Sequence, residues 1–180
     1  MLLFTSSAVY YGGIILYPLY FIQHDGYPSY LAGILLRVHG IGTLLSRWKL
    51  DRISRTVGEE RTTVLAVILT IMGSCIVGWH GELGNRWVLG FGMLLRGAGI
   101  GVLTIISIAG AYVGLTDRQI SHASSVTRMM THLGATIGVT GVTIAMKISS
   151  DGYLFSGSVF DAGHVFLLAL STLCFFMINR

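Results

Sequence analysis

Two arginines lie inside long apolar stretches, and each has a glycine four residues before it and another three residues after it. Arg37 and Arg96 are the centres of these matching patterns, and residues at such spacings share one face of a helix. A guanidinium at membrane depth costs several kcal/mol unless it faces protein, water or an opposite charge. Such an arginine can line a cavity and hold an anionic group, or it can pair with a carboxylate from another helix.

A purely structural role is also possible, in which the guanidinium reaches toward the membrane surface or packs against a neighbouring helix. Arg96 lies too deep in its stretch to reach the surface, so we predict a role in a cavity or in charge pairing. For Arg37 both interpretations stay open. His39 lies beside Arg37 and is assigned to the same candidate cavity. A packing role through hydrogen bonds remains open for this histidine.

The composition indicates a membrane protein. Of the 180 residues, 53% are hydrophobic and only 11% are charged, whereas soluble domains carry about 25% charged residues. The mean hydropathy is +0.72. The net charge is +4, and five of the 12 lysines and arginines lie in one short stretch between apolar runs, which is typical of a cytoplasmic membrane loop. We therefore expect the lipid bilayer as a partner and no nucleic acid.

The apolar runs predict an all-α polytopic protein with six transmembrane helices that form one bundle over residues 1–180. The basic residues of the hydrophilic stretch place it in the cytoplasm as a loop, and alternation from there places both termini in the cytoplasm. A bacterial inner membrane fits the sequence best, although the charge bias alone is also compatible with another plasma membrane. The predicted loop covers 47–63, and the spans cover 2–22, 29–46, 64–79, 87–115, 120–146 and 164–178.

Glycines at helical spacing predict where helices pack closely, because small residues let two backbones approach each other within a membrane. Gly97 and Gly101 form such a pair in the fourth span. Gly134, Gly138 and Gly141 share one face of the fifth span.

None of the eight acidic residues lies inside a predicted span. Ion-coupled transport usually needs a titratable carboxylate at membrane depth, so a coupling acid would have to come from outside this sequence. Motifs of metalloproteases, nucleotide-binding loops and serine hydrolases are absent from the sequence. We predict that the protein is not an enzyme and that it uses no cofactor or metal.

Two segments resemble the carboxy-terminal half of major facilitator superfamily transporters, in particular the fourteen-span drug:proton antiporter branch. The first is GYPSYLAGILLRVHGIGTLLS at 26–46, which is followed by the basic stretch and Gly58. The second is LLRGAGIGVLTIISIAGAYVGL at 94–115, which is followed by SHASSVTRMMTHLGATIGV at 121–139. Order and spacing agree over nearly the whole chain. The resemblance implies one of two six-helix bundles that rock around a central cavity.

By this resemblance, the protein exports drugs or other amphipathic small molecules in exchange for protons. Arg96 would line or brace the cavity, and the glycine stripe of the fifth span would pack against the other bundle. The basic loop would act as a conformational latch through Arg52, Arg55, Gly58 and Arg61.

The partner implied by the resemblance is a missing amino-terminal half or a second copy of the chain. Since an apolar run begins directly at Met1, we expect the sequence to be part of a longer transporter. A different interpretation stays open. The chain can be a six-span protein in its own right, which oligomerises or serves as a binding or scaffold subunit without transport.

Overall fold

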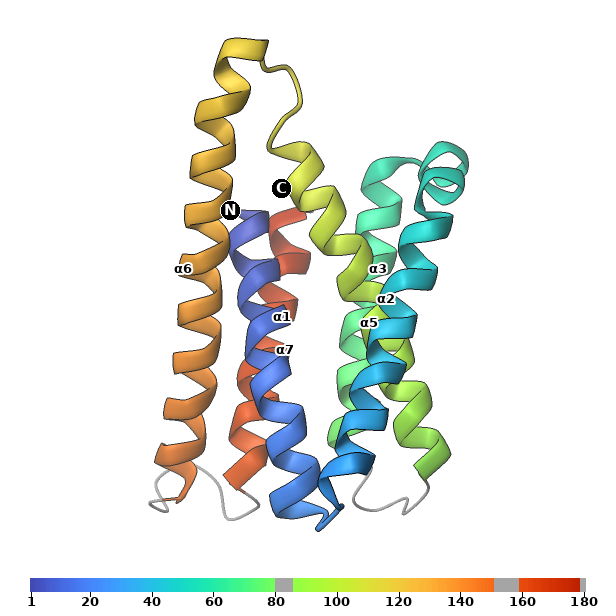
Figure 1. The fold of residues 1–180 in the computed structure, drawn as a ribbon, viewed down its shortest axis with the longest axis vertical. Coiled ribbons are helices and arrows are strands. Elements are labelled where there is room, and N and C mark those ends of the chain that lie inside the picture. The colour runs from blue at the N-terminus through green and yellow to red at the C-terminus, as the bar shows by residue number, and fades with distance from the viewer. Residues whose placement is uncertain (80–85, 151–158, 179–180) are drawn as a thin grey trace.

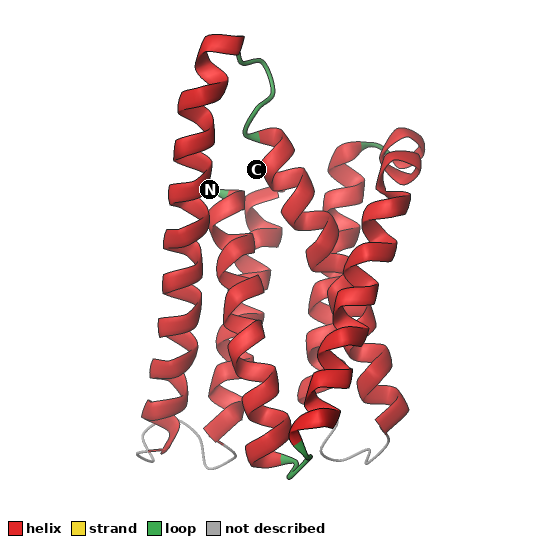
Figure 2. Ribbon diagram, viewed as in Figure 1, coloured by secondary structure: helices red, strands yellow, loops and turns green. Residues whose placement is uncertain are grey.

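The computed structural model describes residues 1–79, 86–150 and 159–178, and all regular structure in these ranges is helical (Figures 1 and 2). The predicted all-α fold class is therefore confirmed for this part of the chain. The helices are α1 (Leu2–Leu19), the π-helix η1 (Tyr20–His24), α2 (Ser29–Val57), α3 (Glu59–Gly78), α5 (Arg86–Gly110), α6 (Asp117–Ser150) and α7 (Val159–Ile178).

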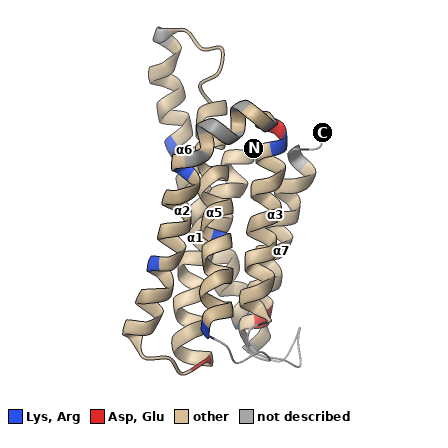
Figure 3. Ribbon diagram, turned by 90° about the vertical axis from the view of Figure 1, so that its right-hand side faces the viewer, with Lys and Arg blue, Asp and Glu red and all other residues tan. Residues whose placement is uncertain are grey.

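The long helices form two packing groups. One consists of α2, α3 and α5, and the other consists of α1, α6 and α7. Helix α5 packs most extensively on α3 and α2, whereas α1 packs most extensively on α6. Helix α7 contacts α6, α1 and α3, and α1 also contacts α5. In Figure 3, α2 and α6 lie toward one side, α3 and α7 toward the other, and α1 and α5 between them. Helix α1 is thus held by helices that are distant from it in the sequence, whereas α5 is held by the two described helices that precede it.

The predicted loop 47–63 is wrong as a description of secondary structure. Helix α2 continues to Val57, α3 begins at Glu59, and the single residue between them is Gly58. Gly58 has a φ of 92°, which glycine adopts without the steric cost that other residues incur. The stretch before it contains neither glycine nor proline, so nothing local ends the helix before Gly58. The cytoplasmic position of this stretch stays a prediction.

The other helix ends also differ from the predicted span limits. Helix α5 ends at Gly110, five residues before the predicted limit, while α6 extends beyond both limits of its predicted span. Helix α7 begins at Val159 rather than at 164. Hydropathy reports which residues prefer lipid, whereas a helix continues until its backbone is interrupted. The 34 residues of α6 span about 51 Å, more than the roughly 30 Å hydrocarbon core, and one end of α6 projects beyond the other helices (Figure 1).

Four helical segments of the described chain are long and apolar enough to cross a membrane. They are Leu2–His24, Glu59–Gly78, Arg86–Gly110 and Gln119–Ser149. The apolar part of α7, Phe160–Phe176, is shorter, and α2 contains Arg37 within its apolar stretch. The described chain thus contains four candidate membrane spans, and the count of six spans stays a prediction.

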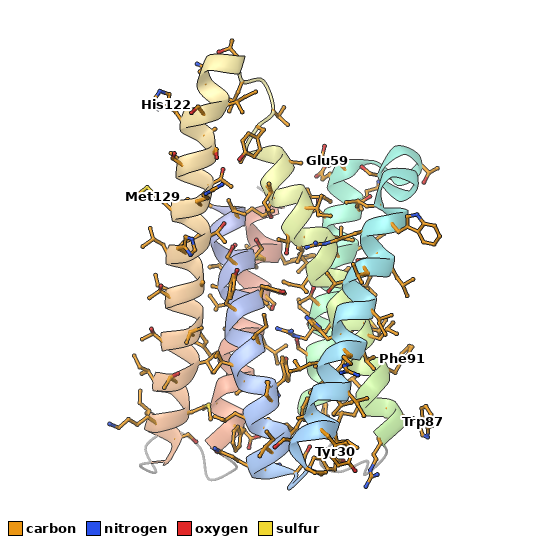
Figure 4. All side chains as sticks on the ribbon, in the orientation of Figure 1. Tyr30, Glu59, Trp87, Phe91, His122 and Met129 are labelled. Atoms are coloured by element: carbon orange, nitrogen blue, oxygen red, sulfur yellow. The ribbon has the colours of Figure 1, made fainter. Side chains whose placement is uncertain are left out.

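Aromatic side chains nevertheless bracket α2 at membrane spacing. Tyr30 is 69% exposed and Trp48 is 85% exposed, and they lie about 27 Å apart along the helix axis at the usual rise per residue. This separation is close to the thickness of a hydrocarbon core, and tyrosine and tryptophan prefer its two interfaces. Figure 4 places Tyr30 at the same end of the molecule as Trp87 of α5. The arrangement favours a membrane position for α2 between Tyr30 and Trp48.

Candidate functional site

Arg96 lies in the interior of the bundle. Its side chain is 1% exposed, and Nη2 donates a hydrogen bond to the backbone carbonyl of Val9 over 3.0 Å. The guanidinium carbon also lies 4.5 Å from the centroid of the Tyr17 ring, a geometry in which the ring face attracts a cation. Because Val9 and Tyr17 both belong to α1, Arg96 of α5 connects the two central helices.

Glycines create the room for this arrangement. A β-carbon added to Gly13 of α1 would collide with the Arg96 guanidinium, and one added to Gly73 of α3 would meet the Arg96 backbone. The glycines that flank Arg96 at 92 and 99 face the side chains of Ile76 and Thr70 on α3. Arg96 is therefore enclosed by α1 and α3, and a molecule outside the bundle cannot reach it in this conformation.

His39 also points into the bundle. It is buried, and its ring stacks on that of Tyr10 with a centroid distance of 6.4 Å and an interplanar angle of 29°. A β-carbon on Gly97 of α5 would collide with the His39 carbonyl. The Thr43 hydroxyl donates a hydrogen bond to the Gly97 carbonyl over 3.0 Å. These contacts place His39 at the closest approach of α2 and α5.

Gly101, the second glycine of the predicted pair Gly97 and Gly101, lies one turn further along the contact between α2 and α5. Gly101 faces Thr43 and Ser46 of α2. In α6, Gly134 and Gly138 lie against the backbone carbonyls of Phe4 and Ala8 on α1, whereas Gly141 faces the Phe166 ring of α7. The expectation that this glycine stripe packs against another bundle is therefore wrong, because helices of the same bundle fill it.

Arg37 has a different environment from Arg96 despite the matching glycine pattern. Its side chain is exposed, and it forms no hydrogen bond or ion pair with any other described residue. A β-carbon added to Gly33 or Gly40 would meet no atom within 4 Å. The structure therefore brings Arg96 and His39 into the interior and leaves Arg37 on the outer surface.

A continuous polar face on α6 was not recognised from the sequence. Eight polar residues follow one another at spacings of three or four, and every one of them is exposed. This polar stripe consists of Ser121, Ser125, Arg128, His132, Thr136, Thr140, Thr143 and Lys147. It lies opposite the glycine face that packs on α1, since such spacings keep residues on one side of a helix. The same spacings are visible in the printed sequence, so a search for polar periodicity would have found the stripe.

The two exposed flanks of α6 differ in polarity. Thr136 and Thr143 donate their hydroxyl protons to backbone carbonyls one turn earlier, each over 2.9 Å, and keep oxygen atoms on the surface. Leu133, Ile137 and Ile144 are exposed on another side of the helix. One flank of α6 is therefore suited to lipid and another to water or protein. Figure 4 shows His122 and Met129 directed away from the bundle on the upper part of this helix.

The predicted latch residues lie where α2 meets α3. The side chains of Arg52 and Arg55 fall outside the described residues. Gly58 forms the junction, and its carbonyl accepts a hydrogen bond of 2.6 Å from the Thr62 hydroxyl. Arg61 is exposed in the first turn of α3. The structure thus describes two of the four latch residues at one exposed helix junction.

The described residues contain no group of three or more histidine, cysteine, aspartate or glutamate side chains that could hold a metal ion.

The sequence model of the family described as Major Facilitator Superfamily matches residues 1–139. The chain belongs to this superfamily. A comparison with curated proteins gives no match.

Superfamily membership makes the chain a membrane protein from a family of transporters. The packing of helices from the first half of the sequence on helices from the second half agrees with this membership. In such transporters each six-helix half contains two three-helix repeats of inverted topology. Here the first three long helices in the sequence are α1, α2 and α3, and the next three are α5, α6 and α7. The first helix of each triplet, α1 or α5, packs chiefly on helices of the other triplet.

Proposed function

We propose that this bundle is one half of a secondary active transporter, which exports drugs or other amphipathic small molecules in exchange for protons by alternating access. An amino-terminal half completes the transporter, in a cell membrane of bacterial inner-membrane type with both termini of this chain in the cytoplasm. The polar stripe of α6 is the observation that carries this proposal. The stripe runs along a helix that is long enough to cross the membrane, and all eight of its residues are exposed.

Lipid is an unfavourable neighbour for this stripe. Arg128, His132, Thr136 and Thr140 lie within the candidate span Gln119–Ser149, and polar residues in membrane helices usually face protein or a water-filled cavity. A second bundle across from α6 would enclose such a cavity. The apolar flank of α6 at Leu133 and Ile137 would then face lipid.

The interior contacts support a bundle that moves as one body. Arg96 ties α5 to α1 through Val9, and these two helices hold the two packing groups. We assign Arg96 the bracing role, with His39 packed at the neighbouring contact. Alternating access then comes from rocking of this body against the other half, with the junction around Gly58 and Arg61 as the latch.

Proton coupling needs carboxylates at membrane depth, and none of the eight acidic residues lies inside a predicted span. Among described residues, Asp25 lies just after η1 and pairs with His24 over 3.0 Å. Glu59 and Glu60 occupy the first turn of α3, and Asp161 occupies the first turn of α7. We therefore place the coupling carboxylates in the amino-terminal half.

An ethidium accumulation assay in an efflux-deficient bacterium tests the proposal. One strain produces the chain alone, and another produces the chain extended by the coding sequence upstream of Met1. We expect only the extended protein to lower dye accumulation, and a protonophore to abolish the difference. Dye extrusion by the chain alone would refute the need for a second half. If the extended protein extrudes none of a panel of cationic, neutral and anionic dyes, the export function is wrong.

Cysteine accessibility in the extended protein tests the cavity separately, after Cys75 and Cys174 are replaced by serine. We expect single cysteines at Thr136 and Thr140 to react with a membrane-impermeant thiosulfonate. Matched cysteines at Ile137 and Ile144 should stay unreactive. Equal reactivity of the two pairs would remove the polar stripe as support for a cavity.

A further inference from the structure

Arg37 is a cation on the outer surface of the bundle, within the second predicted span. Along the axis of α2 it lies about 10 Å from Tyr30 and about 17 Å from Trp48 at the helical rise per residue. These two aromatic residues are strongly exposed and mark the expected interfaces. If α2 crosses the membrane between these two residues, Arg37 lies within the hydrocarbon slab rather than at its edge.

The direction of Arg37 is set by the packing of α2. The buried positions Ala32, Leu35 and His39 face the bundle interior. Arg37 lies two residues from Leu35 and two from His39, which places it on the opposite side of the helix. It is exposed there and has no partner within the described chain.

The matching glycine–arginine–glycine pattern in α5 shows that a neighbouring helix can pack against such a helix face. Around Arg96, the flanking glycines lie against side chains of α3, and the guanidinium contacts a third helix. Around Arg37, the positions of Gly33 and Gly40 are open. The same arrangement of residues is filled by neighbouring helices in one case and vacant in the other.

A second copy of this chain does not supply a counter-charge. All eight acidic residues lie outside the apolar spans, so a parallel copy offers no carboxylate at the depth of Arg37. Lipid does not supply one at that depth either, because phosphate groups lie at the membrane surface. A carboxylate on a different transmembrane helix would neutralise the guanidinium, since arginine and carboxylate form paired charge-assisted hydrogen bonds.

We propose that Gly33, Arg37 and Gly40, termed here the Arg37 face, dock a transmembrane helix of the partner half. This helix carries an aspartate or glutamate at the depth of Arg37, and its carboxylate pairs with the guanidinium. The two glycines allow the helix backbone to approach closely. The proposal rests on the proposed function only in requiring that a partner half exists.

Energy transfer in lipid vesicles tests the proposal with the full 180-residue chain. The probe is a synthetic leucine–alanine transmembrane peptide with one glutamate about 10 Å below its outer interface and a dansyl group as acceptor. The tryptophans of the chain are the donors, and the matched peptide has glutamine in place of glutamate. We expect the glutamate peptide to associate at least about tenfold more tightly than the glutamine peptide.

Variants of the chain assign this preference to the Arg37 face. Arg37→Gln should abolish the preference, and Arg37→Lys should keep a weaker one because the charge remains. Gly40→Leu should weaken binding of both peptides. Arg47→Gln changes another exposed arginine of α2 and should leave the preference intact. Circular dichroism establishes that each variant keeps its helix content, and Arg37→Lys keeps the test decisive if Arg37→Gln does not fold.

Three outcomes would overturn the proposal. The wild-type chain can bind both peptides equally, in which case Arg37 reaches the membrane surface by itself. Arg37→Gln can keep the preference, which places the docking site elsewhere. The chain can self-associate in a way that Arg37→Gln abolishes, which assigns the face to a second copy. Failure of dye export leaves the peptide result unchanged, so the two proposals fail separately.

Discussion

Arg96 donates a hydrogen bond of 3.0 Å to the backbone carbonyl of Val9 and thereby joins α5 to α1. A backbone carbonyl is a fixed acceptor, because its position depends on the helix rather than on a side-chain rotamer. The arginine carries its charge into the interior, where Tyr17 of α1 covers it. The contact therefore couples the two packing groups at the centre of the bundle.

Tyr17 should contribute through its ring rather than through its hydroxyl. The hydroxyl is buried and has no hydrogen-bond partner among the described residues, so Tyr17→Phe should leave stability unchanged or raise it. Tyr17→Leu removes the contact with Arg96 and should lower the free energy of unfolding by about 2 kcal/mol. Unfolding in mixed detergent micelles, followed by circular dichroism, measures both. An equal loss in Tyr17→Phe would show that the hydroxyl holds an essential bond.

Gly97 should tolerate no larger residue, whereas Gly90 in the same helix should tolerate alanine. A β-carbon at Gly97 would collide with the His39 carbonyl, but one at Gly90 meets nothing within 4 Å. Gly97→Ala should therefore lower stability by about 1–3 kcal/mol, because the α2 and α5 backbones must separate. Gly90→Ala should be neutral or stabilising by up to about 1 kcal/mol. The same unfolding assay compares them, and similar effects of the two changes would contradict the close contact.

The sequence predicted an all-helical membrane protein because the apolar runs are long and the charges are few. It could not predict that Arg37 and Arg96 point in opposite directions. Their glycine patterns are the same, and only the packing of α2 and α5 distinguishes them. The polar stretch at 47–63 suggested a loop, yet α2 continues to Val57, because a helix satisfies its backbone hydrogen bonds internally whether or not its residues are apolar. The polar stripe of α6 was predictable, since its spacing is periodic in the sequence.

Gly58 should resist replacement because of its backbone conformation. Its φ of 92° lies in a region that residues with a side chain rarely adopt, at a cost of about 1–3 kcal/mol. Gly58→Ala should lower stability by this amount or lengthen the connection between α2 and α3. Gly110→Ala is the control, because that glycine has open space and no positive φ. Thermal unfolding in detergent measures both, and equal transition temperatures for the two variants would show that the junction is not strained by a side chain.

The two cysteines should react with maleimide at very different rates. Cys174 is 1% exposed, and its thiol donates a hydrogen bond to the Thr5 hydroxyl over 3.0 Å. Cys75 is half-buried, so it should be modified first in folded protein in detergent. We expect Cys174 to react at least about a hundredfold more slowly, because reagent reaches it only when α7 and α1 separate locally. Mass spectrometry of timed samples resolves the two steps, with Cys75→Ser as the variant that keeps only the slow one. Equal rates in folded protein would mean that the contact between Cys174 and Thr5 opens freely.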